Sequence, residues 1–141
     1  QPDQISQLVQ VFTDKNIDIS TLAKKISEDK HVQDPNIVKV VRQSNSYALY
    51  FSRSPIPYSR NIKKGKWTTK QDYFKHVGIY AFKASALKKL IVLPPSNLEI
   101  TESLEQLRWL ENGYKIHVGT TDFENIGIDT PDDLAQLNNK I

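Results

Sequence analysis

The sequence predicts an α/β protein, in which helices pack against a β-sheet. Segments whose apolar residues recur at helical spacing alternate along the 141 residues with segments rich in β-branched and aromatic residues. No internal repeat or low-complexity tract interrupts this alternation. The composition, with 38% hydrophobic and 25% charged residues, is typical of a globular domain and excludes an intrinsically disordered chain.

A helix and a strand are expected first. The helix begins at Pro2, which suits a first helical turn. Four apolar residues then follow helical spacing: Ile5, Leu8, Val9 and Phe12. Residues 17–26 favour a strand because their apolar and polar positions alternate. Residues 27–35 are polar and end in an Asp-Pro pair, which indicates a short helix or a loop that closes in a turn.

A hairpin and a basic loop are expected next. Residues 37–41 and 47–51 are rich in β-branched and aromatic residues, and a turn signal at residues 43–46 separates them. Residues 54–70 contain two prolines, a glycine and several basic residues, which predicts an exposed loop. We expect the hairpin and the loop to form an insertion on the sheet.

Residues 73–82 alternate in hydrophobicity and predict a strand. Gly78 inside it marks a position of close backbone approach. Residues 84–90 predict a short helix, which the two prolines at positions 94 and 95 separate from the next.

Ser96 can cap a longer helix that Gly113 stops. Four leucines would line this helix: Leu98, Leu104, Leu107 and Leu110. Residues 114–119 predict a strand, and the Thr130-Pro131 pair predicts the start of a final helix.

Charge and composition exclude several classes of function. The net charge of +3 is a mild excess, and no nucleic-acid motif accompanies it. The absence of cysteine excludes disulfides and thiolate metal sites, which suits a cytoplasmic protein. No segment approaches the ~18 apolar residues of a membrane span. Because helical patterning begins almost at Gln1 and the chain has no methionine, we expect either a trimmed chain or a piece of a longer enzyme.

Four motifs follow one another along nearly the whole chain. They are NIVKVV with YALYFSRSPIP at residues 36–57, HVGIY at 76–80, LEQLR at 104–108 and GIDTPDDL at 127–134. Together, in this order and spacing, they resemble the CMP-KDO synthetase family, in which KDO is 3-deoxy-D-manno-octulosonate. The resemblance implies a Rossmann-like nucleotide-diphospho-sugar transferase fold, of which this chain would be the C-terminal part.

The resemblance also implies an activity. Such enzymes transfer the cytidylyl group of CTP to KDO and release pyrophosphate for lipopolysaccharide synthesis. They are magnesium-dependent cytoplasmic dimers. Residues 36–83 would form the β-rich part that binds the sugar acid and dimerises. Phosphoryl transfer of this kind needs positioning and charge neutralisation more than covalent help from the protein.

Arginines are the expected ligands for the carboxylate of the sugar acid. The planar guanidinium of Arg53, at the end of a strand, can grip a carboxylate with two hydrogen bonds. An ordinary surface arginine at a turn is the alternative, and the family motif favours the binding role. Arg60 is a further candidate from its family position, although the run of basic residues around it also fits an exposed, solvated loop.

His76 and Tyr80 lie four residues apart on a strand and therefore on one face. The resemblance assigns both to hydrogen bonds with the sugar hydroxyls. It also assigns Glu105 and Gln106 to the sugar, with Arg108 orienting Glu105, although Glu105 and Arg108 alone could form a solvated helix ion pair.

Asp129 is the expected magnesium ligand, because magnesium prefers carboxylate oxygens and the family uses this aspartate as one of two metal-binding carboxylates. A helix-capping carboxylate is the alternative. The family's phosphate loop and its second metal motif are absent from the sequence. We therefore expect the isolated chain to be inactive, and to dimerise or to pair with a separate N-terminal half.

Three other functions are compatible with parts of the sequence. Sialic-acid cytidylyltransferases share the fold and the chemistry, so the acceptor could be a sialic acid. A non-catalytic module that binds sugar acids or dimerises is a second possibility. A nucleic-acid binder is the third, and only the basic charge favours it.

Overall fold

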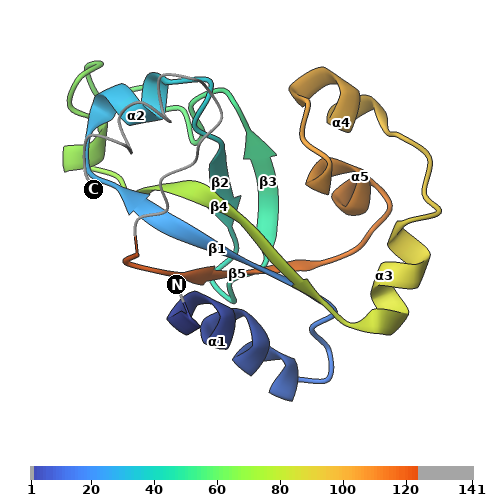
Figure 1. The fold of residues 1–141 in the computed structure, drawn as a ribbon. Coiled ribbons are helices and arrows are strands. Elements are labelled where there is room, and N and C mark those ends of the chain that lie inside the picture. Colours follow the sequence, from blue (N-terminus) through green and yellow to red (C-terminus); the bar gives the residue numbers. More distant parts are fainter. Residues whose placement is uncertain (1, 124–141) are drawn as a thin grey trace, which may run out of the picture.

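The computed structural model describes residues 2–123. Within them one mixed sheet has five strands in the order β3-β2-β4-β1-β5 (Figure 1). The strands are β1 (Ile19–Ile26), β2 (Lys39–Arg42), β3 (Ala48–Ser52), β4 (Tyr73–Phe82) and β5 (Ile116–Thr120). β5 pairs with β1 in parallel, and the other neighbours pair antiparallel. The predicted α/β class is confirmed.

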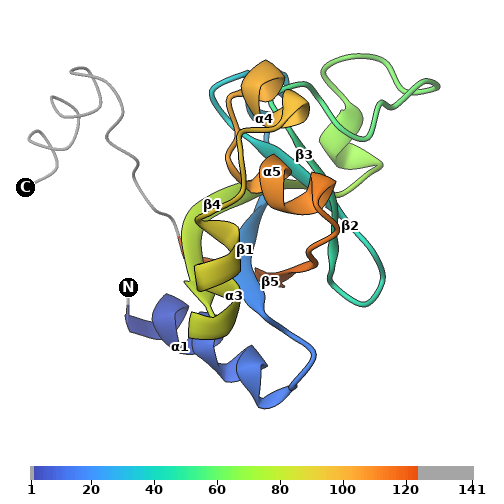
Figure 2. The same ribbon diagram turned by 90° about the vertical axis from the view of Figure 1, so that its right-hand side faces the viewer.

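Helices cover both faces of the sheet. They are α1 (Pro2–Gln10), α2 (Asp29–Gln33), α3 (Ala84–Leu90), α4 (Asn97–Glu102) and α5 (Gln106–Glu111), with short 3₁₀ segments at Val11–Thr13 and Trp67–Thr69. None of the helices in residues 2–123 combines the length and the apolar character that crossing a membrane requires. α1 lies on one side of the sheet, and α3, α4 and α5 lie on the other (Figures 1 and 2).

The main core lies between the sheet and α3 and α5. The inward residues of the strands, such as Ile19, Phe51 and Ile116, pack there against Leu107 and Trp109. A smaller cluster under α1 joins Leu8 to Leu22 and Val77. Within β1, Ile19 belongs to the main core and Leu22 to the cluster under α1. The strand is therefore buried on both faces, as its largely buried pattern shows.

The predicted hairpin forms and extends the same sheet. β2 pairs with β3 on one side and, through Lys39 and Lys75, with β4 on the other. The turn of the hairpin reaches β5, because the amide of Val118 donates to the carbonyl of Ser46 over 2.8 Å. Tyr47 also forms a bridge with His117. The sheet is thus curled, so that its two edge strands, β3 and β5, come into contact.

The predicted helix from Ser96 to Leu110 is wrong, because the chain forms two helices there. Ser96 does cap α4, through a reciprocal capping box with Glu99. α4 stops at Ser103, whose φ of 53° is left-handed, and Gln106 begins α5. The leucine spacing continues across this break, so periodicity alone does not reveal it. Gly113, with φ 80°, ends α5 as predicted.

The close backbone approach predicted at Gly78 is also wrong. A Cβ atom placed there would meet nothing within 4 Å. Gly78 instead lies where the register shifts, between the pairs Thr21–Tyr80 and Leu22–Val77. The tight position is Gly119, where a Cβ would lie 3.0 Å from a methyl carbon of Leu22.

The basic loop of residues 54–70 is only partly exposed, contrary to the prediction. Trp67 is 1% exposed and packs with Tyr73, Ile26 and Val32 in a separate core cluster. The carboxylate of Asp29 accepts hydrogen bonds from the amides of residues 67 and 68, which fixes this end of the loop. The prolines and the charges of the loop indicate exposure, and the burial of Trp67 is not predicted by them.

Candidate functional site

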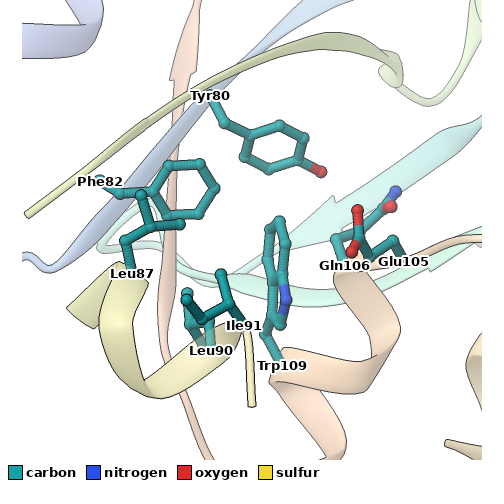
Figure 3. Close-up of a pocket in the computed structure, with 8 residues that line it drawn as sticks. All are labelled: Tyr80, Phe82, Leu87, Leu90, Ile91, Glu105, Gln106 and Trp109. Carbon is teal, nitrogen blue, oxygen red and sulfur yellow. The ribbon is translucent and has the colours of Figure 1, made fainter. Parts of the chain in front are cut away.

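A cavity of about 280 Å³ lies between β4, α3 and α5 (Figure 3). Eight side chains line it: Tyr80, Phe82, Leu87, Leu90, Ile91, Glu105, Gln106 and Trp109. β4 supplies the aromatic wall, α3 and the residue after it supply the aliphatic wall, and the start of α5 supplies the carboxylate and the amide. Three of the predicted sugar-binding residues therefore share one cavity.

The polar side chains gather at one end of this cavity. Figure 3 shows the hydroxyl of Tyr80 pointing toward the side where Glu105 and Gln106 lie. This hydroxyl is buried and has no hydrogen-bond partner among the described residues. Burial, followed by the nearby Glu105 carboxylate, raises the pKa of Tyr80 far above its usual value. The phenol is therefore protonated, and it can donate a hydrogen bond into the cavity.

The opposite end of the cavity is apolar. Phe82 stacks on Tyr80 with ring centroids 5.8 Å apart, and the Trp109 ring meets both edge-on. Leu87 and Ile91 are 42% and 68% exposed, so this wall borders the surface. The cavity can hold a ligand that has polar groups at one end and C–H surface at the other.

His76 lies behind Tyr80 on the same face of β4, as predicted. The bulge adds two residues to β4, an even number, so side chains before and after it still alternate between the same two faces. The rings of His76 and Tyr80 lie 5.2 Å apart. The Nε2 atom of His76 is 2.9 Å from the hydroxyl of Thr21. Burial lowers the pKa of His76 to about 4, so the ring is neutral near pH 7. His76 does not line the cavity but supports the Tyr80 ring.

Arg108 lies beside the cavity and ties α5 to α4. Its Nε atom donates to the carboxylate of Glu99 over 2.7 Å, and a second nitrogen bonds the other oxygen. This pairing lowers the pKa of Glu99. The Glu105 carboxylate is 3.7 Å from Arg108 and largely exposed. Arg108 and Glu105 are thus within ion-pair distance, as the predicted orienting role requires. The hydrogen bonds of Arg108 to a carboxylate are made to Glu99 and not to Glu105.

Arg53 is placed outside the lining of the cavity. Its Nε atom donates to the carbonyl of Glu102 over 2.8 Å, and its two terminal nitrogens donate to the carbonyls of Pro35 and Ser103. A guanidinium has five N–H groups, so these three bonds leave two N–H groups for a ligand. The binding role of Arg53 stays a prediction.

Arg60 is not among the residues that line the cavity. Arg60 is exposed in the loop of residues 54–70. Asp129 and the predicted helix at Thr130 lie outside the described residues. Residues 2–123 contain no group of three or more histidines, aspartates and glutamates that could hold a metal ion. The part of the chain that the structure describes therefore does not test the predicted magnesium site.

The apolar half of the cavity was missed by sequence reasoning. Phe82 follows Tyr80 by two residues on a strand, and Trp109 follows Gln106 by three on a helix, so both spacings indicate a shared face. Leu87 and Ile91 gave no such signal, because their place beside β4 depends on the path of the chain after the strand.

Comparisons with known proteins identify the family. The family model described as Cytidylyltransferase matches residues 1–116. A 3-deoxy-manno-octulosonate cytidylyltransferase of Parabacteroides distasonis is 50% identical over 139 residues, which cover 96% of this chain and 55% of the relative. One of Thermodesulfovibrio yellowstonii is 51% identical over 133 residues, covering 94% of this chain and 52% of the relative.

A solved structure agrees with these relatives. It is that of CMP:2-keto-3-deoxy-manno-octonic acid synthetase complexed with CTP, which matches with a TM-score of 0.88 and 38% identity over 99% of this chain and 56% of that one. The chain thus spans about half the length of the proteins that it matches. The fold is that of the Rossmann-like nucleotidyltransferases. The chain belongs to the cytidylyltransferase family.

Proposed function

We propose that the complete protein to which this chain belongs transfers the cytidylyl group of CTP to KDO and releases pyrophosphate. The observation that carries this proposal is the 50% identity, across almost the whole chain, to proteins named 3-deoxy-manno-octulosonate cytidylyltransferase. The matched synthetase structure is complexed with CTP, which supports CTP as the nucleotide substrate.

The cavity supports a role for this chain in binding the sugar acid. The Tyr80 phenol can donate a hydrogen bond, the Gln106 amide can donate and accept, and the Glu105 carboxylate can accept. Sugar hydroxyls offer both donors and acceptors. The Phe82 and Trp109 rings can pack against the C–H surface of the sugar. Arg53 and Arg60 are the proposed partners of the substrate carboxylate.

Magnesium, a dimer and a cytoplasmic location belong to the same proposal. When bound, the metal would neutralise charge on the triphosphate, and Asp129 is the residue proposed to hold it. The family resemblance supports these three features, together with a place in lipopolysaccharide synthesis. We expect residues 1–141 alone to be inactive, because they span about half the length of the relatives.

The test is a transfer assay on the complete enzyme, with CTP and either KDO or a sialic acid as acceptor. Pyrophosphate release that depends on KDO, with CMP-KDO as product, is the expected result. A clear preference for sialic acid would show that KDO is not the acceptor. No transfer to either acid, with binding of KDO retained, would instead favour the non-catalytic module.

A further inference from the structure

A buried lysine joins two segments of the chain, residues 34–39 and Arg53 directly after β3. Lys39 is 0% exposed. Its Nζ atom donates to the main-chain carbonyls of Asp34 over 2.7 Å, Ile37 over 2.5 Å and Arg53 over 2.5 Å. An ammonium group has three N–H donors, so all three are used. A buried charge that is fully hydrogen-bonded to main-chain atoms holds these segments in one arrangement.

Glu102, the last residue of α4, completes the cluster from the other side. One carboxylate oxygen accepts from the Ser52 hydroxyl over 2.6 Å, and the other accepts from the amide of Arg53 over 2.9 Å. The Arg53 Nε atom returns to the Glu102 carbonyl over 2.8 Å. Burial lowers the pKa of Lys39, while the Asp34 and Glu102 carboxylates oppose that shift. We name Lys39, Ser52, Arg53 and Glu102 the Lys39 cluster.

The Lys39 cluster fixes the corner between α4 and α5. Ser103 follows Glu102 directly in a left-handed conformation, and its carbonyl accepts from Arg53. Three and four residues after Glu102 come Glu105 and Gln106, which line the cavity. The position of these two side chains therefore depends on where the corner is held.

We propose that Lys39 and Glu102 are positioning residues for the sugar-acid site, acting through the α4–α5 corner on Glu105 and Gln106. This inference rests on the proposed function. Lys39 and Glu102 do not line the cavity, so they act on the substrate only through the residues that they hold. Loosening the corner should weaken binding of the sugar acid and leave the CTP requirement unchanged.

Two serines offer a matched pair of variants in the complete enzyme. Ser52→Ala removes the hydroxyl that donates to Glu102. Ser20→Ala removes an equally buried hydroxyl, which donates to the Leu8 carbonyl over 2.8 Å on the α1 side of the sheet. Ser52→Ala also removes the acceptor of the Ser54 amide, 3.0 Å away, so it is expected to lower stability somewhat more than Ser20→Ala. Both changes delete buried hydrogen bonds, and only the first touches the corner. Glu102→Gln is the stronger variant, because it removes the charge beside Lys39.

The kinetic readout separates positioning from general loss of stability. We expect Ser52→Ala to raise KM for the sugar acid about fivefold and Glu102→Gln to raise it more, since one lost hydrogen bond costs a factor of that order. KM for CTP should change less than about twofold in both. Ser20→Ala should leave both constants unchanged. Unchanged sugar-acid KM in Ser52→Ala and Glu102→Gln, or equal changes in the two serine variants, would overturn the proposal.

Hydrogen exchange on the same variants distinguishes this proposal from the proposed function. The amides of Leu107 and Arg108 donate to the carbonyls of Leu104 and Glu105 at the start of α5. We expect the peptide of residues 103–111 to exchange faster in Ser52→Ala and not in Ser20→Ala, whichever substrate the enzyme uses. If KDO proves not to be the substrate but this difference appears, the positioning role stands and the proposed function fails. Equal exchange in all variants would refute positioning.

Discussion

The Tyr80 hydroxyl is a buried donor without a partner among the described residues, which is an energetic cost to the folded chain. Tyr80→Phe removes that cost and keeps the ring contacts with Phe82 and Trp109. We expect the free energy of unfolding to stay the same or to rise by about 1 kcal/mol. KM for the sugar acid in the complete enzyme should rise, because the donor is lost. Urea unfolding and steady-state kinetics test both, and a clear loss of stability would show that the hydroxyl already has a partner.

His76 makes stability depend on pH. Its pKa is lowered from 6.5 to about 4 in the folded chain by burial. Between these values the unfolded chain binds more protons, so stability is full above pH 6.5 and falls as the pH drops toward 4.

The expected loss from this one residue between pH 7 and pH 5 is on the order of 2 kcal/mol. The measurement is urea unfolding of the wild type and of His76→Gln across this pH range. The pH dependence that comes from carboxylates is common to both proteins and cancels in the comparison. The wild type should lose more stability on acidification than the variant. Parallel curves would mean that His76 titrates in the folded protein as it does in the unfolded one.

At the scale of elements, the capping box at Ser96 holds the start of α4. Its hydroxyl accepts from the amide of Glu99, whose carboxylate also pairs with Arg108 of α5. Ser96→Ala should cost about 1 kcal/mol of stability. Ser6→Ala is the control, because that exposed hydroxyl only bonds a carbonyl within α1. Thermal unfolding that affects both variants equally would contradict the capping role.

Elements were predictable from sequence where local signals and packing agree. The hairpin, β4 and the stop at Gly113 follow from alternation and turn chemistry. The break at Ser103 was not predictable, because the leucine spacing runs through it and the Lys39 cluster holds the corner through contacts distant in sequence. For the same reason, the hydrogen bonds of Arg53 to main-chain carbonyls could not be predicted from a motif that indicates only the end of a strand.

At the scale of the whole molecule, apolar side chains remain uncovered. Ile5 and Val9 on α1 are 61% and 55% exposed, although their helical spacing is that of a buried face. Such a face favours association. We expect residues 1–141 to self-associate in sedimentation experiments, and the double variant Ile5→Gln, Val9→Gln to associate less. A monomeric wild-type chain at high concentration would contradict this expectation.

The candidate site shows the same division between what sequence can and cannot predict. Tyr80, Glu105 and Gln106 were named from motifs and share the cavity. Its aliphatic wall depends on the path of the chain between β4 and α5, which no local pattern encodes. Asp129 lies outside the described residues, so the metal site stays a prediction.

The central claim is that this cavity receives the sugar acid, and the two tryptophans of the chain test it directly. Trp109 lines the cavity, whereas Trp67 is buried in another cluster. The measurement is titration of the ¹⁵N-labelled complete enzyme with KDO, with both indole signals assigned through Trp→Phe variants. We predict that the Trp109 signal shifts until it saturates while the Trp67 signal stays in place. Saturable binding of KDO with no shift at Trp109 would contradict the claim.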